Sequence, residues 1–235
     1  DRPSLVVAAE NVAVEIERSI LGAIETHPSC QVSVMDTIVD STGPDPDGVE
    51  RPAFCGLEGA GPGGFLTLLD ATVIGRIHAT ALPLVSNAIL DARPGPAGEA
   101  PVRAVRRQTG CMRFSYVPPD SVTPRRYRCQ PDHAAAEALA AAEALHPSLT
   151  DAAKERLVRL ARARVRPVFS ARRYGRPDYL RLERATPGAI REGADDDASM
   201  GAYHKLYEPQ RERNLAIRRA GYPPLGLEAG IFFET

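Results

Sequence analysis

The stretch Val14-Glu-Ile-Glu-Arg-Ser-Ile-Leu-Gly22 begins a pattern that recurs within residues 14–91 and decides the fold. Three further copies follow: Val32-Ser-Val-Met-Asp-Thr-Ile-Val-Asp40, Leu66-Thr-Leu-Leu-Asp-Ala-Thr-Val-Ile-Gly75 and Leu82-Pro-Leu-Val-Ser-Asn-Ala-Ile-Leu-Asp91. Each copy begins with a short run that has an aliphatic residue at every second position. A few polar residues, two aliphatic residues and then Gly or Asp follow. A unit this short cannot bury its apolar face alone, so successive copies are expected to stack on one another.

Stacking places equivalent side chains above one another, because alternation along a strand puts every second residue on the same face. We expect three inward ladders, made of Val14, Val32, Leu66 and Leu82; of Ile16, Val34, Leu68 and Leu84; and of Ile20, Ile38, Val73 and Ile89. The corners are expected at Gly22, Asp40, Gly75 and Asp91, where Gly tolerates positive φ and Asp can bond its own backbone.

The sequence therefore predicts a mainly β fold, a short right-handed parallel β-helix (a solenoid) over residues 1–130. The alternative is an antiparallel sandwich, whose hairpins usually carry Asn-Gly or Asp-Gly turns. The one Asp-Gly pair, Asp47-Gly48, lies in the Gly- and Pro-rich insertion 43–64, which we expect to be a surface loop. The last coil is expected over residues 102–117.

A second region, residues 131–235, is expected to be helical and irregular and to pack on or beside the solenoid. Residues 132–146 are rich in strong helix formers, and Pro147 ends that helix. Thr150 or Ser148 can cap a second helix, which completes a helical hairpin. A further short helix is expected over 208–219, and the apolar end after residue 224 is expected to return as a strand or to pack on the solenoid.

Composition indicates a soluble globular protein, with 43% hydrophobic and 25% charged residues. No apolar run approaches the ~20 residues of a membrane span, and no secretory signal is visible. A cytoplasmic location follows as an expectation, and Asp1 as the first residue is typical of a fragment of a longer protein. The four cysteines have no C-x-x-C spacing, so we expect free thiols, with Cys30 and Cys111 facing inward.

No motif carries catalysis, a cofactor or a metal ion, and we expect that the protein is not an enzyme. The five histidines lack metal-pair spacing. Asp195-Asp196-Asp197 lacks the alternating ligands of a calcium loop, which favours a solvated or arginine-pairing cluster, although cation binding stays open. Asp36 and Asp70 occupy equivalent repeat positions and could mimic a carboxylate pair, but the repeat alone explains their alignment.

Charge is divided unevenly along the chain. Residues 1–100 carry 5 basic and 14 acidic side chains, whereas residues 101–235 carry 24 and 16. Residues 154–184 alone hold 11 basic side chains and 3 acidic ones. They contain no nucleic-acid-binding module, so this basic face is expected to dock on the acidic half or on a partner. Because Arg and Tyr dominate interface hot spots, the expected partner contacts are Arg172, Arg173, Tyr174 and Arg211.

Several segments resemble one protein group: residues 106–118 (Arg-Arg-Gln-Thr-Gly-Cys-Met-Arg-Phe-Ser-Tyr-Val-Pro), 124–131, 191–204 and 207–232. The chain is similar to the C-terminal part of uncharacterised bacterial proteins encoded with phage-tail-like contractile injection systems. The resemblance covers nearly the whole chain and brings no catalytic residues. It implies a structural role at the baseplate of an injection particle, with other particle subunits as partners.

Two functional hypotheses follow. The first is a non-enzymatic assembly component of such a particle, with self-association left open. The second is a tailspike-like β-helix that binds or cleaves a polysaccharide. The absence of Trp and the 6% aromatic content disfavour sugar stacking. A basic nucleic-acid-binding domain is a weaker third interpretation, and it predicts an affinity that falls steeply with salt.

Overall fold

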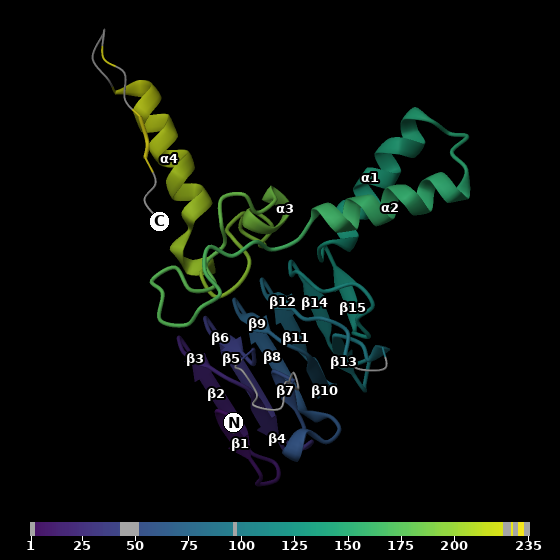
Figure 1. The fold of residues 1–235 in the computed structure, drawn as a ribbon, viewed down its shortest axis with the longest axis vertical. Helices are drawn as coiled ribbons and strands as arrows, with labels where there is room; N and C mark the ends of the chain where they lie inside the picture. The colour runs from purple at the N-terminus through teal and green to yellow at the C-terminus, as the bar shows by residue number, and fades with distance from the viewer. Residues whose placement is uncertain (1–2, 43–51, 96–97, 223–226, 228–229, 233–235) are drawn as a thin grey trace.

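The computed structural model describes residues 3–42, 52–95, 98–222, 227 and 230–232. Its first half consists of parallel β-strands that lie side by side, and its second half consists of helices and irregular segments (Figure 1). A helical hairpin extends from one end of the strand region, and helix α4 extends from the other side (Figure 1). The fold is therefore mainly parallel β-sheet with a helical C-terminal region.

The strands form three rows in which every pairing is parallel. One row contains β2 (Ala13–Glu17), β5 (Gln31–Met35), β8 (Gly63–Leu69), β11 (Leu84–Ser86), β14 (Cys111–Arg113) and β15 (Arg125–Tyr127). A second row contains β1 (Leu5–Val7), β4 (Ile24–Thr26), β7 (Phe54–Cys55), β10 (Ile77–Ala81) and β13 (Val102–Ala104). The pairing of β10 with β8 joins these two rows into one 11-stranded sheet.

The third row is a separate four-stranded sheet of β3 (Ile20–Leu21), β6 (Ile38–Asp40), β9 (Thr72–Ile74) and β12 (Ile89–Asp91). Isolated bridges extend this row from Ile89 to Tyr116 and from Tyr116 to Gln130. The chain thus visits the rows in turn, and each strand pairs with its equivalent from the next pass.

The predicted register is correct for the first three copies in the row of β2. Val14 pairs with Val32, which pairs with Leu66, and the neighbouring ladder joins Ile16, Val34 and Leu68. The fourth copy was predicted one residue out of place. Val85 rather than Leu84 pairs with Leu68, because Ser86 and Asn87 occupy the positions of Leu69 and Asp70.

The third predicted ladder is also wrong by one residue. Ile20, Ile38, Thr72 and Ile89 form one line of pairs, while Val73 pairs with Val39 and Leu90. Val39, Val73 and Leu90 lie in the interior core, whereas Ile38 and Ile89 face outward beneath the C-terminal region. The predicted alignment set Ile38 opposite Val73, which leaves one extra residue, Ala71, in the third copy. The structure pairs Ile38 with Thr72, so no residue is skipped.

The sharp corners also lie elsewhere than predicted. Among the predicted corners only Gly75 has a positive φ, of 118°. The repeated left-handed residue instead follows each strand of the β2 row, with φ between 46° and 53°, at Arg18, Asp36, Asp70, Asn87, Phe114 and Arg128. We call these six residues the corner row. Asp and Asn tolerate this conformation better than other non-glycine residues do, which explains three of its members.

A hydroxyl side chain often follows the corner residue and bonds back across it. The Thr37 hydroxyl donates to the Met35 carbonyl at 2.7 Å, and the Ser115 hydroxyl donates to the Arg113 carbonyl at 2.7 Å. The same oxygens accept from the neighbouring turns, at Ser19 N and Ala88 N. These bonds satisfy backbone groups that leave the sheet at the corner.

The insertion is not wholly a loop. Residues 43–51 lie outside the described residues, but β7 adds a strand to the sheet, and Ala53, Phe54 and Cys55 are buried. Gly64 is the second residue of β8, where an added Cβ would lie 2.1 Å from the Cys30 carbonyl oxygen. Glycine is needed at this position because the backbone at Cys30 passes too close to leave room for a side chain.

All four cysteines are free, as predicted. Cys30, Cys55 and Cys129 are buried, but Cys111 is exposed, so its predicted inward position is wrong. The side chain that points inward from β14 is the buried Met112. The stack also runs further than predicted, because β15 pairs with β14 beyond residue 117.

The predicted helical hairpin is confirmed as α1 (Asp132–Leu145) and α2 (Asp151–Arg164). The Thr150 hydroxyl caps α2 by accepting from Ala153 N at 3.4 Å, and Lys154 of α2 pairs with Glu143 of α1 at 2.6 Å. After the short α3 (Gly188–Arg191), α4 spans Glu208–Gly221 and confirms the third predicted helix. No helix among the described residues is long and apolar enough to cross a membrane.

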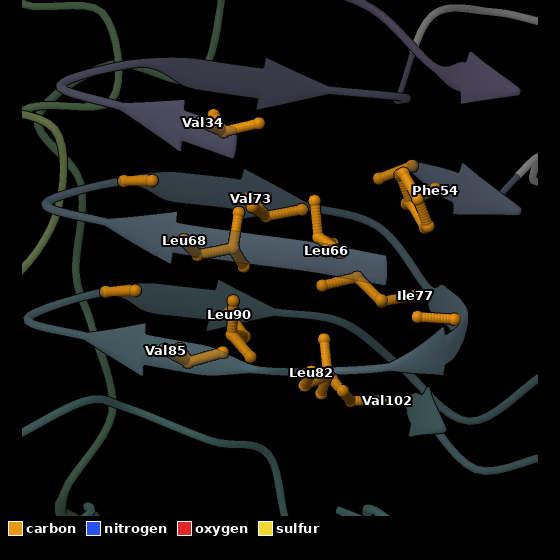
Figure 2. Close-up of a cluster of buried hydrophobic side chains, with 14 of the residues drawn as sticks. Val34, Phe54, Leu66, Leu68, Val73, Ile77, Leu82, Val85, Leu90 and Val102 are labelled. Carbon is orange, nitrogen blue, oxygen red and sulfur yellow. The ribbon is translucent and has the colours of Figure 1, made fainter. Parts of the chain in front are cut away.

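Two apolar clusters stabilise this arrangement. The first lies between the strand rows, where side chains such as Leu68, Val73 and Leu90 point toward one another (Figure 2). The second lies between the outer face of the four-stranded sheet and the segment of residues 165–207. Burial of each Leu, Ile or Val side chain favours folding by about 1.5–3 kcal/mol, so both clusters are expected to contribute substantially to the free energy of unfolding.

Candidate functional site

The C-terminal segment of residues 165–207 covers the outer face of the four-stranded sheet. Ile38, Ile74 and Ile89 of the sheet share a cluster with residues of the segment, among them Phe169, Leu180, Ile190 and Met200. Backbone bonds fix the contact, since Gly201 N donates to the Asn87 carbonyl at 2.7 Å and Ala202 N donates to Thr72 Oγ1 at 3.0 Å. We call this contact the seam.

Charged and polar pairs border the seam. Arg172 Nη2 lies 2.5 Å from Asp91 Oδ2, and Lys205 Nζ lies 2.5 Å from Asp36 Oδ2. The Tyr179 hydroxyl donates to Asp40, and burial together with this carboxylate raises the pKa of Tyr179 above its ordinary value of 10.0. In these pairs the acidic residues come from the strand region and the basic ones from the segment.

The four predicted contact residues are distributed over two elements. Arg172, Arg173 and Tyr174 lie in a loop of the segment, and Arg211 lies in α4. Arg172 is used within the chain, because it pairs with Asp91 and its guanidinium carbon lies 4.9 Å from the centre of the Phe169 ring. Arg173 and Tyr174 are exposed, although Tyr174 also packs edge-on against Tyr179.

Ion pairs of its first half attach helix α4 to the segment of residues 165–207. Arg191 Nη2 lies 2.5 Å from Glu212 Oε2, Arg213 Nη2 lies 3.2 Å from Glu192 Oε2, and Arg181 pairs with Glu208. Of the residues of α4, all of which the structure describes, only Pro209 is buried. The second half of the helix extends away from the rest of the molecule (Figure 1).

A stripe of exposed side chains runs along one face of α4 and continues to Tyr222, the residue that follows the helix. Arg211, Leu215, Arg218 and Tyr222 are spaced by four, three and four residues, which places them on one helix face. Leu215 is 49% exposed and Tyr222 is 83% exposed. Sequence reasoning selected Arg211 alone, although this spacing was already readable in the sequence. We call these four residues the α4 stripe.

A groove of about 620 Å³ lies where the strand region, the turn after Tyr116 and the segment meet. Its charged lining consists of Arg76, Arg93, Arg166, Arg172, Asp91 and Asp120. Arg76 pairs with Glu99 and Arg172 pairs with Asp91, so two of these guanidinium groups bind carboxylates of the chain. Planar guanidinium forks bind carboxylates and phosphates in a bidentate manner, which suits Arg93 and Arg166 to an anionic ligand.

Asp36 and Asp70, the carboxylates considered as a possible catalytic pair, both contact other side chains of the chain. Asp36 and Asp70 occupy the corner row, as their equivalent repeat positions predict. Asp36 pairs with Lys205, Asp70 Oδ1 accepts from Asn87 Nδ2 at 3.2 Å, and both side chains are largely buried. The Asp195–197 cluster is exposed, and within the described residues Asp195 contacts Asn87 while Asp196 contacts His204 and accepts from Ala198 N.

No family model matches this chain, and no curated protein or solved structure matches it.

Proposed function

We propose that this protein is a non-enzymatic structural component of a phage-tail-like contractile injection particle, located at the baseplate of the assembled particle in the cytoplasm. The resemblance of residues 106–118, 124–131, 191–204 and 207–232 to proteins encoded with such systems motivates the proposed particle and the place within it. The α4 stripe carries the argument for a partner.

The strand region would serve as the rigid part of this component. We propose that the three rows are the faces of a short right-handed parallel β-helix, in which each pass of the chain is one coil. The repeated corner row and the in-register pairing of equivalent residues support this interpretation. Stacked coils tolerate variation of outward side chains without disturbing the core, which suits a scaffold.

The α4 stripe would be the contact with another particle subunit. Leu215 and Tyr222 offer apolar area at low entropic cost, and Arg211 and Arg218 border it with positive charge. The matching surface is therefore an apolar groove with an acidic rim. Arg173 and Tyr174 would provide a second contact, as the sequence predicts.

The test is co-purification with the baseplate and tube proteins of the particle. The double variant Leu215→Ala, Tyr222→Ala should lose more than about 2 kcal/mol of binding if both residues are hot spots. Ile217→Ala is the matched control, because Ile217 is 65% exposed on the same helix but points away from the stripe. Normal assembly and firing of particles that lack the protein would refute the proposal.

The tailspike-like function remains the second candidate because of the arginine-lined groove. An acidic polysaccharide is the ligand that Arg93 and Arg166 would suit. A glycan array combined with a reducing-sugar assay decides this, and no signal in either removes the candidate.

A further inference from the structure

The loop of residues 194–198 is fastened to the corner row next to a buried histidine. Asn87 Nδ2 donates to Asp195 Oδ1 at 2.9 Å, and Asp195 N donates to Asn87 Oδ1 at 3.2 Å. Asp196 Oδ1 accepts from Ala198 N at 3.1 Å. These bonds hold one oxygen of each aspartate and fix the direction of the other.

His204 points into this group. It is only 5% exposed, and it lies in the short 3₁₀ turn His204–Leu206. Its Nδ1 lies 3.1 Å from the Ser199 carbonyl oxygen, which can only accept, so Nδ1 must carry a proton. Its Nε2 faces Asp196 Oδ2 at 3.4 Å and Asp70 Oδ1 at 3.9 Å, and it forms no hydrogen bond with any described residue.

With Nδ1 donating to the Ser199 carbonyl, Nε2 is directed at the carboxylate oxygens of Asp196 and Asp70. A metal ion held between Nε2 and these oxygens would be attracted by all of them. A charged N–H···O bond is usually about 2.7–2.9 Å long, so the 3.4 Å between Nε2 and Asp196 Oδ2 is long for such a bond.

The distance fits a metal ion better. Zinc binds nitrogen and oxygen at about 2.0–2.2 Å with tetrahedral angles, which separates two ligand atoms by about 3.4 Å. Ligand atoms of Asp195, Asp196 and His204 all lie within 4.8 Å of one another. The bond from Nδ1 to a backbone carbonyl is also the usual way in which a metal-binding histidine is oriented.

We propose that Asp195, Asp196 and His204 bind a divalent transition-metal ion, with zinc as the best fit to one imidazole and two carboxylates. Asp70 adds negative charge beside the ion. Both aspartates are exposed, so the ion can enter from solvent. Bound there, it would join the loop of residues 194–198 to the turn at His204 within the segment, beside the corner row, independently of the proposed particle function.

The test is titration of the whole chain, stripped with a chelator, with Zn²⁺ followed by calorimetry. One equivalent should bind, and Asp196→Asn and His204→Gln should each weaken binding by more than about tenfold. Asp196 is exposed and Asn has the same shape, so that variant should keep the fold; equal melting curves in chelator verify this. Co²⁺ should give the absorption bands of a tetrahedral site.

His133→Gln is the control, because His133 and Glu137 lie 3.4 Å apart one turn from each other on α1 and could hold an ion adventitiously. It should leave the titration unchanged. Failure to bind one equivalent of Zn²⁺ would overturn the proposal. Binding that survives Asp196→Asn or that His133→Gln abolishes would overturn it equally.

Discussion

Asn87 and Asp195 are 108 residues apart, yet they exchange two hydrogen bonds: Asn87 Nδ2 donates to Asp195 Oδ1 at 2.9 Å, and Asp195 N donates to Asn87 Oδ1 at 3.2 Å. Asn87 also belongs to the corner row, with a φ of 53°. One residue therefore both turns the chain and holds the C-terminal segment.

Replacing Asn87 should separate these two roles. Asn87→Gly keeps the left-handed backbone but removes the side-chain bonds, so we expect a loss of about 1–3 kcal/mol in the free energy of unfolding. Asn87→Ala should lose about 1–2 kcal/mol more, because a Cβ is strained there. Urea unfolding measures both. Equal stability of the two variants would contradict the backbone role.

Gly201→Ala should open the seam. Gly201 has a φ of 94°, and an added Cβ would lie 2.6 Å from Thr72 Oγ1 and 2.9 Å from Ile89 Cδ1. We expect a loss of about 1–3 kcal/mol and faster hydrogen exchange at Gly201 and Ala202. Gly188→Ala is the control, because nothing lies within 4 Å of its Cβ position. Similar losses in both variants would refute the steric explanation.

Alkaline pH should weaken the seam through Tyr179. Burial and the bond to Asp40 raise the pKa of this phenol above 10.0, so folding favours its protonated form. The resulting stability is complete below pH 10 and is lost as pH rises beyond that value. Tyr179→Phe should therefore show a smaller decline in the free energy of unfolding above pH 10. An unchanged decline would exclude Tyr179 as a cause.

Thiol labelling should distinguish Cys111 from the other cysteines. Cys111 is exposed, whereas burial raises the pKa of the Cys129 thiol to about 11 and leaves almost no thiolate at neutral pH. A thiol reagent should label Cys111 rapidly, and Cys111→Ser should abolish the rapid phase. Persistence of the rapid phase in that variant would contradict the outward orientation of the Cys111 side chain on β14.

The sequence by itself determined the strands of the β2 row up to β11 and the pairing of its first three copies. Alternation in residues 32–35 and 66–69 selects one face, and the recurring spacing aligns Val32 with Leu66, as the structure confirms. Helix formers and a Thr cap likewise determined the hairpin and its start. These features depend on neighbours in the chain, so local periodicity carries them.

Only the tertiary structure decided the corners, the added strand β7 and the seam. Ile38 and Val39 are both aliphatic, and which one faces inward depends on the left-handed turn at Asp36. His204 and Asp196 carry no motif spacing, and Asp70 and Asn87 come from much earlier in the chain. Such groups meet because apolar burial brings distant segments together, and a one-dimensional pattern does not record that contact.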